Sequence, residues 1–350
     1  MNRREFIKLS ALTAGAAISG HMVPGYLKGA DAGTPDTSGH LYDMKVRSMD
    51  FEIIFDTEII NPPKHGEPVS IWMPLSLSGF EQDVTHLLID SPVAFHINEE
   101  HHFGNKVVYA GPDRLNSGDK ITVKSRIHRR TVSVIEDKNE DIRKHLVLSE
   151  KEQWNEDIKA FADKVVGGET DPLETGRKIY YALHDLLTYD KDTIGCGPGV
   201  SVWTYENRGG RCADFQSLFR TMMVYKGIPV KWEQGIMIPY PSEKILSGEL
   251  EGDCIGTLCW NKFYIGEGRW IPVDLVEGNQ QKEMRDYFFG HLSPNRFNIS
   301  TGRNITLNPP QKSEMLNTFP VTYGEYDGMP LIYGHHYRNN VSYKVLNVEM

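Results

Sequence analysis

The stretch 209–219, GGRCADFQSLF, decides how this sequence is interpreted. Apolar residues recur at helical spacing after Cys212 until Gly227 and Pro229 end the pattern, which predicts a helix that begins near Cys212. A thiol at a helix start feels the positive end of the helix dipole and unpaired backbone N–H groups, which lower its pKa and favour the thiolate. Cys212 is therefore a candidate nucleophile, and a buried structural cysteine at a helix start is the plainer alternative.

Further elements flank this stretch on both sides. The segment Asp171–Glu174, DPLE, is typical of a helix start, with Asp as the N-cap and Pro at the first helical position. Downstream, residues 260–265 and 269–274 each indicate a strand, and the Gly-rich segment 266–268 turns between them. The sequence thus predicts a helix, a Gly-rich loop, the Cys212 helix and then a hairpin.

Three of these segments, taken in order, resemble the transglutaminase-like superfamily, which is related to papain-type cysteine proteases. Residues 210–219 are similar to the family's nucleophile helix, 259–264 to the strand that carries its His, and 270–274 to the strand that carries its Asp. The resemblance covers roughly residues 145–300. It implies an α+β core in which a helix-borne Cys packs on an antiparallel sheet.

The family's chemistry implies roles for four residues of this chain. A Cys thiolate attacks an amide carbonyl, a His moves the proton, and an Asp orients that His. The matching positions make Cys212 and Asp274 the expected catalytic residues. Gly210 and Trp260 are the expected substrate-binding residues.

The sequence departs from the family's pattern at the third member of the triad. The family's His stands two residues before the Trp, and this chain has Leu258 there. Leu cannot accept a proton or pair with a thiolate. His291, which follows the Asp strand, is the candidate substitute base. Two smaller departures are Lys262, where the family often has an acidic residue, and Gln216, where close relatives often have His.

Composition and charge exclude several other classes of function. The formal net charge of −9 argues against nucleic acid as a partner. Five other histidines lack acidic or Cys partners at ligand spacing, so we expect no metal, and we expect no cofactor. These histidines are His96, His101, His102, His335 and His336.

The regions outside the transglutaminase-like segment are expected to be rich in strands. Residues 51–59 and 121–127 alternate apolar with mostly polar residues, the signature of half-buried strands. They predict an antiparallel β-sandwich-like domain over residues 45–135. Residues 301–350 are expected to form a C-terminal β-rich extension.

The first 44 residues are expected to direct export. Arg3 and Arg4, the mildly apolar stretch 9–19 and the small-x-small site 30–32 resemble a twin-arginine signal peptide over residues 1–32, followed by a spacer over 33–44. Cleavage would remove four basic and two acidic side chains and lower the formal charge from −9 to −11. We therefore expect a periplasmic or secreted protein without a transmembrane segment in the mature chain.

Export also bears on the cysteines. If Cys212 is a thiol, then Cys196, Cys254 and Cys259 can form at most one disulfide, and the pairing stays open.

The sequence as a whole predicts an exported transglutaminase-like protein with impaired catalysis that binds a peptide or protein. The alternatives are an active cysteine amidase, peptidase or transglutaminase with a non-standard base, and a structural envelope module. If the chain is an enzyme, it is a papain-type hydrolase or acyltransferase.

Overall fold

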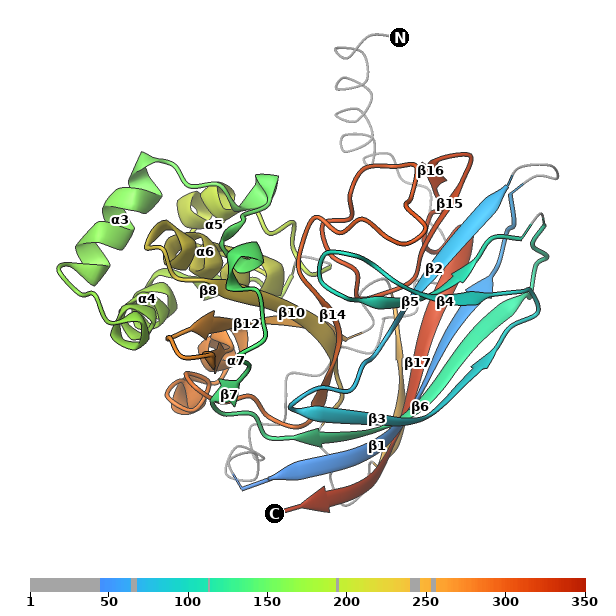
Figure 1. The fold of residues 1–350 in the computed structure, drawn as a ribbon, viewed down its shortest axis with the longest axis horizontal. Coiled ribbons are helices and arrows are strands. Elements are labelled where there is room, and N and C mark those ends of the chain that lie inside the picture. Colours follow the sequence, from blue (N-terminus) through green and yellow to red (C-terminus); the bar gives the residue numbers. More distant parts are fainter. Residues whose placement is uncertain (1–44, 64–67, 113, 193–194, 240–245, 253–255) are drawn as a thin grey trace, which may run out of the picture. The chain divides into compact units, whose positions relative to one another are not determined.

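The structure is a computed structural model that describes residues 45–350 except 64–67, 113, 193–194, 240–245 and 253–255. The expected signal peptide and spacer, together with Cys254, lie outside the described residues. The described part of the chain contains three five-stranded sheets and a group of helices (Figure 1).

The first sheet is built around strand β1, and its neighbours are antiparallel to it. Phe51, Ile53 and Phe55 of β1 are buried at every second position, as the alternating pattern predicted. In the order β11-β17-β1-β6-β3, the strands are Ser247–Glu251, Tyr337–Glu349, Ser48–Ile59, Lys120–Arg130 and Gln82–Asp90.

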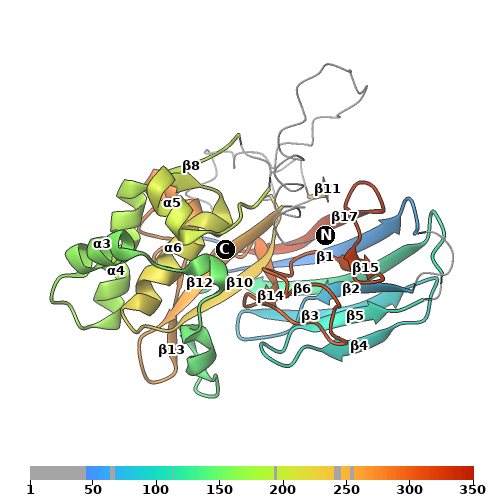
Figure 2. The ribbon, with the colours of Figure 1, turned by 90° about the horizontal axis from the view of Figure 1, so that it is seen from above.

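The second sheet packs against the first to form the expected sandwich. Buried apolar side chains from both sheets, among them Ile53 and Val108, belong to one hydrophobic cluster. Figure 2 shows the strands β2, β5 and β4 side by side. In the order β16-β15-β2-β5-β4, the strands are Met329–Pro330, Tyr323–Tyr326, Val69–Leu75, Lys106–Ala110 and His96–Glu99.

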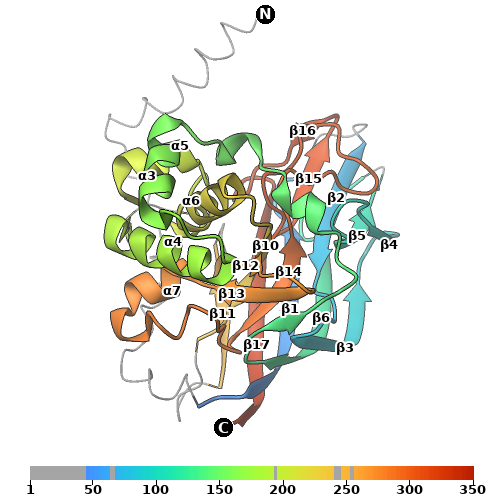
Figure 3. The ribbon, with the colours of Figure 1, turned by 60° about the vertical axis from the view of Figure 1, so that its left-hand side comes forward.

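The last described strand, β17, lies in the first sheet between β11 and β1. β17 pairs with β1 from Ser48 opposite Glu349 to Ile59 opposite Tyr337, and Figure 3 shows the two running together. Residues 301–350 therefore share their main sheet and core with residues 45–135.

The third sheet is the one that the helices cover (Figure 1). In the order β14-β10-β12-β13-β7, its strands are Arg296–Thr301, Val230–Met237, Thr257–Tyr264, Arg269–Val273 and Ile135–Glu136. The helices α3 to α7 are Glu156–Val166, Pro172–Leu186, Ser201–Asn207, Cys212–Tyr225 and Leu275–Gln280. The short elements are η2 (Ile142–Leu146), η3 (Glu150–Glu152), η4 (Lys282–Met284) and the parallel pair β8 (Thr188–Tyr189) and β9 (Gly209–Gly210).

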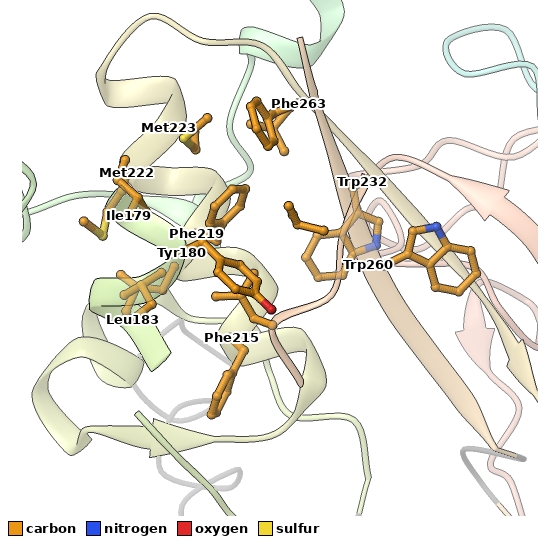
Figure 4. Packing of buried hydrophobic residues seen from close by; sticks show 14 of the residues in the cluster. Ile179, Tyr180, Leu183, Phe215, Phe219, Met222, Met223, Trp232, Trp260 and Phe263 are labelled. Atoms are coloured by element: carbon orange, nitrogen blue, oxygen red, sulfur yellow. The ribbon is translucent and has the colours of Figure 1, made fainter. Parts of the chain in front are cut away.

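Helix α6 lies at the centre of the core beneath this sheet. Figure 4 shows its apolar side chains between those of α4 and the aromatic side chains of the strands. Phe215, Phe219 and Met222 of α6 are completely buried. This packing explains why the helical spacing after Cys212 was such a clear signal: every apolar residue of α6 has an apolar neighbour.

The local signals at α4 are also confirmed. Asp171 is its N-cap and accepts a hydrogen bond from the Glu174 backbone N–H at 2.9 Å, with Pro172 at the first helical position. Gly176 follows on the buried side, where an added Cβ would lie 2.6 Å from the Phe263 ring. Together, the sandwich and the helix-covered antiparallel sheet confirm the predicted α+β fold class.

Candidate active site

Cys212 is the first residue of α6, as predicted. Asp214 shapes the approach to it: its carboxylate accepts hydrogen bonds from the backbone N–H of Arg211 and of Gly199, each at 2.8 Å. Gly210 has φ +152°, and an added Cβ there would lie 2.6 Å from Asp214 Oδ2. Gly210 is therefore needed for the turn into the helix.

The Cys212 thiol lies among sulfur and phenol groups. Its Sγ is 3.6 Å from the backbone oxygen of Cys196. Burial raises the pKa of Cys259, while a hydrogen bond with Cys212 partly lowers it. Burial, and then the neighbouring Cys212, also raise the pKa of Tyr189. Only 4% of Cys212 is exposed, so the expected nucleophile lies below the surface.

Leu258 lies on β12 opposite Gly235 of β10 and is buried in the same hydrophobic cluster as Cys212. The two-residue period of a strand puts Leu258 on the same side of β12 as Trp260. Position 258 therefore offers an apolar wall where the family's pattern has an imidazole.

Asp274 directly follows β13 and is the N-cap of α7. Its Oδ1 accepts hydrogen bonds from the backbone N–H groups of Val276 and Glu277 at 3.0 and 3.1 Å. Gln216, one turn into α6, donates to the same oxygen at 3.4 Å. The structure thus brings the residue expected as catalytic Asp against the Cys212 helix.

Arg296 is the main partner of Asp274, and the sequence analysis missed it in this role. Its Nη1 lies 2.5 Å from Asp274 Oδ2, and both side chains are completely buried. Its Nη2 donates to Ser293 at 3.0 Å, and its guanidinium lies 5.4 Å from the centre of the Trp260 ring. No local motif marks Arg296, because the pair joins the start of β14 to the end of β13 across 22 positions of the sequence.

Gln216 and Asn261 form a second polar contact between α6 and β12. Asn261 Nδ2 donates to the backbone oxygen and to Oε1 of Gln216, at 2.9 and 3.0 Å. Gln216 therefore joins Asn261 to Asp274. A neutral amide stands where close relatives often have His, and it links the elements through hydrogen bonds without offering a base.

His291, the candidate substitute base, is exposed. Its ring stacks on Tyr287 with centroids 5.1 Å apart, and its Nδ1 lies 3.2 Å from the Tyr287 backbone oxygen. The contacts described for His291 are thus with Tyr287 rather than with Cys212 or Asp274.

His184 is the other histidine near the motifs, and it packs between α4 and α7. Its ring lies 4.3 Å from that of Tyr180, and a Cβ on Gly278 would lie 3.0 Å from its Nε2. Burial, and then Arg285, lower the pKa of His184 to about 3. This imidazole is held neutral near neutral pH and belongs to the helix packing.

Trp260, expected to bind substrate, is completely buried, and its Nε1 donates to Glu233 at 2.7 Å. In this structure its indole anchors β12 to β10. Gly210 is buried as well, and it pairs with Tyr189 of β8.

The described residues contain no group of three or more His, Cys, Asp or Glu that could hold a metal ion. Within the same residues, no helix has the length and hydropathy needed to cross a membrane.

Comparison with known proteins agrees with this geometry. Residues 159–275, which include Cys212, Leu258 and Asp274, match the family model of the transglutaminase-like superfamily. An uncharacterised protein of Haemophilus influenzae is 23% identical over 348 residues, covering 88% of this chain and 92% of that protein.

Two solved structures are similar as well. The first, from Cytophaga hutchinsonii and provisionally assigned as a cysteine protease, superposes with a TM-score of 0.57 at 15% identity, over 87% of this chain and 92% of that one. The second is the periplasmic domain of TgpA from Pseudomonas aeruginosa, with a TM-score of 0.36 at 14% identity, over 71% of this chain and 96% of that one. The segment 159–275 of this chain is therefore a transglutaminase-like domain, and the chain shares its fold with the Cytophaga hutchinsonii structure.

Proposed function

We propose that this chain is an exported transglutaminase-like protein that binds a peptide or protein and does not turn over amides. One observation carries the proposal: Leu258 stands at the position of the family's His, and Arg296 pairs with the carboxylate of Asp274.

The consequence for catalysis follows from proton transfer. The nitrogen of an amide leaves only after it has been protonated. A nearby group must therefore take the proton of the thiol and give it to that nitrogen before the C–N bond breaks. Arg296 cannot do this, because a guanidinium stays protonated in proteins. Losing a positioned acid–base group lowers a rate by about 10²–10⁴-fold.

The binding role is supported by an exposed aromatic residue on α5, the helix that precedes α6. Trp203 exposes 41% of its surface on α5, a helix that precedes the turn into α6. Tryptophan is enriched at interfaces because it combines a large apolar area with one N–H donor. Trp203 is therefore the proposed anchor for a peptide or protein partner.

The catalytic part is tested by release of amine from a mixed peptide substrate. The wild type and Cys212→Ala should show the same low background. Cysteine-dependent hydrolysis or acyl transfer, present in the wild type and lost in Cys212→Ala, would overturn the proposal and favour an enzyme with a non-standard base.

A restoration experiment tests the reason for the inactivity. The protein is treated with a thiol-directed electrophile near pH 7. After digestion, the labelled fraction of the peptide that contains Cys212 is followed by mass spectrometry. Leu258→His alone should change the rate little, since Arg296 already holds Asp274. Leu258→His with Arg296→Gln should label faster, and the matched control Leu258→Asn with Arg296→Gln should not. Equal rates in both double variants would contradict this account.

The binding part is tested with peptides selected on the wild type from a random display library. Selected peptides should bind Cys212→Ala as well as the wild type and Trp203→Ala more weakly. Trp154→Ala is the matched control, because Trp154 is similarly exposed, at 38%, but packs against Tyr225 at the far end of α6. Equal binding to both tryptophan variants would exclude Trp203 as the anchor.

The export part of the proposal rests on Arg3 and Arg4. Replacing both with Lys should leave the precursor in the cytoplasm of the producing cells. An unchanged periplasmic yield would refute twin-arginine transport.

A further inference from the structure

A cavity whose lining does not include Cys212 lies between the sandwich and the helix-covered sheet. It has a volume of about 240 Å³ and is bordered by the loop before β3, by residues of β10, β12 and β13, and by β14. Pockets for whole small molecules usually measure about 300–1,000 Å³, so this one suits a single side chain rather than a complete ligand. Its lining residues come from both the sandwich and the helix-covered sheet.

A buried charge cluster forms the polar wall of the cavity. Lys262 Nζ lies 2.5 Å from Glu81 Oε1 and 2.6 Å from Glu233 Oε1. Arg129, behind the wall, lies 3.1 Å from Glu81. Although burial alone would raise the pKa of Glu81, Lys262 and Arg129 lower it to about 2, so this carboxylate is charged at neutral pH. The ammonium donors of Lys262 point at carboxylates.

Among the charged side chains that line the cavity, carboxylates outnumber ammonium groups by three to two. Asp137 adds a third carboxylate, and Lys231 adds the only further ammonium among the lining residues described. Lys231 Nζ is held by Glu140 at 2.5 Å and lies 4.0 Å from Asp137 Oδ2. Arg129 also contacts Glu81, and Trp260 donates to Glu233. A carboxylate offers about four acceptor positions, so Asp137, whose other described partner is the Asn139 backbone N–H, keeps acceptor capacity.

Aromatic residues complete the cavity. Phe80 lies at its edge with 64% of its surface exposed. Trp270 lies inside, with Lys231 Nζ 4.9 Å from its ring centre, so one ammonium already sits on an aromatic face here. The Trp270 Nε1–H is buried and finds no hydrogen-bond partner among the described residues. An aromatic face attracts a cation, and an unsatisfied indole N–H favours an acceptor such as a peptide carbonyl.

We propose that this cavity binds a lysine side chain of a peptide, with the ammonium against Asp137 and Phe80 and a peptide carbonyl near the Trp270 indole N–H. The site is distinct from the Cys212 region, and its test does not depend on whether Cys212 reacts.

The experiment is a calorimetric titration of the mature protein with three capped tripeptides: Ala-Lys-Ala, Ala-norleucine-Ala and Ala-Glu-Ala. The lysine peptide should bind saturably and the other two should not. Cadaverine should bind more weakly than the lysine peptide, since it has no carbonyl for Trp270. Equal binding of cadaverine would overturn the peptide part, and equal binding of norleucine or glutamate would overturn the whole proposal.

Variants locate the site. Asp137→Asn and Phe80→Ala should each lower the affinity for the lysine peptide by about five-fold or more, as expected for the loss of one contact with a cation. The matched controls are Asp157→Asn and Leu88→Ala, two exposed residues outside the cavity's lining. Cys212→Ala should bind like the wild type. Unchanged affinity in both cavity variants, or no saturable binding of the lysine peptide at all, would refute the site.

Discussion

The two sides of β12 differ sharply although both are buried. On one side, Cys259 contacts Cys212, and Phe263 lies with its ring centre 6.1 Å from that of Phe219. On the other side, Trp260 and Lys262 meet Glu233. One strand therefore separates a mainly apolar core beneath α6 from a charged layer that faces the sandwich.

The difference between the two sides of β12 shows where the buried charged side chains lie. Beneath α6 the Cys212 thiol lies in the apolar core, next to the buried Cys259. The charged side keeps the ion pairs of Lys262 with two glutamates. The Arg296–Asp274 pair links the two sides, because Arg296 lies over the Trp260 ring and Asp274 also contacts Gln216 of α6. Buried ion pairs contribute little net stability but are costly to break. The charged layer should therefore be the less tolerant of single substitutions.

The largest expected effect is that of Lys262→Met. The change leaves Glu81 and Glu233 buried without the ammonium that joins them, so we expect a loss of about 3–5 kcal/mol in the free energy of unfolding. Urea denaturation measures it. Lys159→Met, which removes an exposed pair with Glu156, is the control and should cost less than about 1 kcal/mol. Equal losses would mean that the charged layer is no more demanding than the surface.

Arg296→Met should come next. It removes the guanidinium from Asp274, but the backbone N–H groups of α7 still hold Oδ1, so part of the carboxylate's stabilisation remains. We expect a loss of about 3 kcal/mol, near the lower end for a broken buried pair. Combining it with Asp274→Asn should recover part of this loss, because the unpaired charge is then gone. A double variant less stable than Arg296→Met would contradict the ion-pair account.

Gly176→Ala probes the apolar side. The new methyl group would lie 2.6 Å from the Phe263 ring, so we expect overpacking that costs about 1–3 kcal/mol, reduced by the better helix propensity of Ala. Gly168→Ala is the control, since nothing lies within 4 Å of its added Cβ. If Gly176→Ala is as stable as the control, the apolar side is less tightly packed than the structure indicates.

The smallest effect concerns pH and His184. Its pKa is about 3 in the folded chain and about 6.5 when unfolded, so the unfolded state binds a proton first as pH falls. The contribution of His184 to the free energy of unfolding is fully present above about pH 6.5 and is lost as the pH falls toward 3. Denaturation curves between pH 6.5 and 5 should therefore show a shallower decline for His184→Gln than for the wild type. The exposed variant His101→Gln is the control, and identical slopes for all three proteins would exclude His184.

Local patterns were sufficient for several features. The alternation in 51–59, the Asp171-Pro172 cap and the spacing after Cys212 describe interactions within a few residues, and each element appears where the pattern indicated. The order of the three family motifs was likewise enough to recognise the domain. Trp260 was harder to interpret, since a motif says that a residue is present and not whether its side chain is exposed.

By itself, the sequence determined the fold class, the helix that begins at Cys212 and the Leu at position 258. Only the tertiary structure decided what Asp274 and Lys262 bind. Arg296 lies 22 positions from Asp274 and Glu81 lies 181 positions from Lys262, so neither pair leaves a periodic trace in the sequence. The physical reason is that a buried charge takes whichever opposite charge the packing of distant strands brings within hydrogen-bond distance.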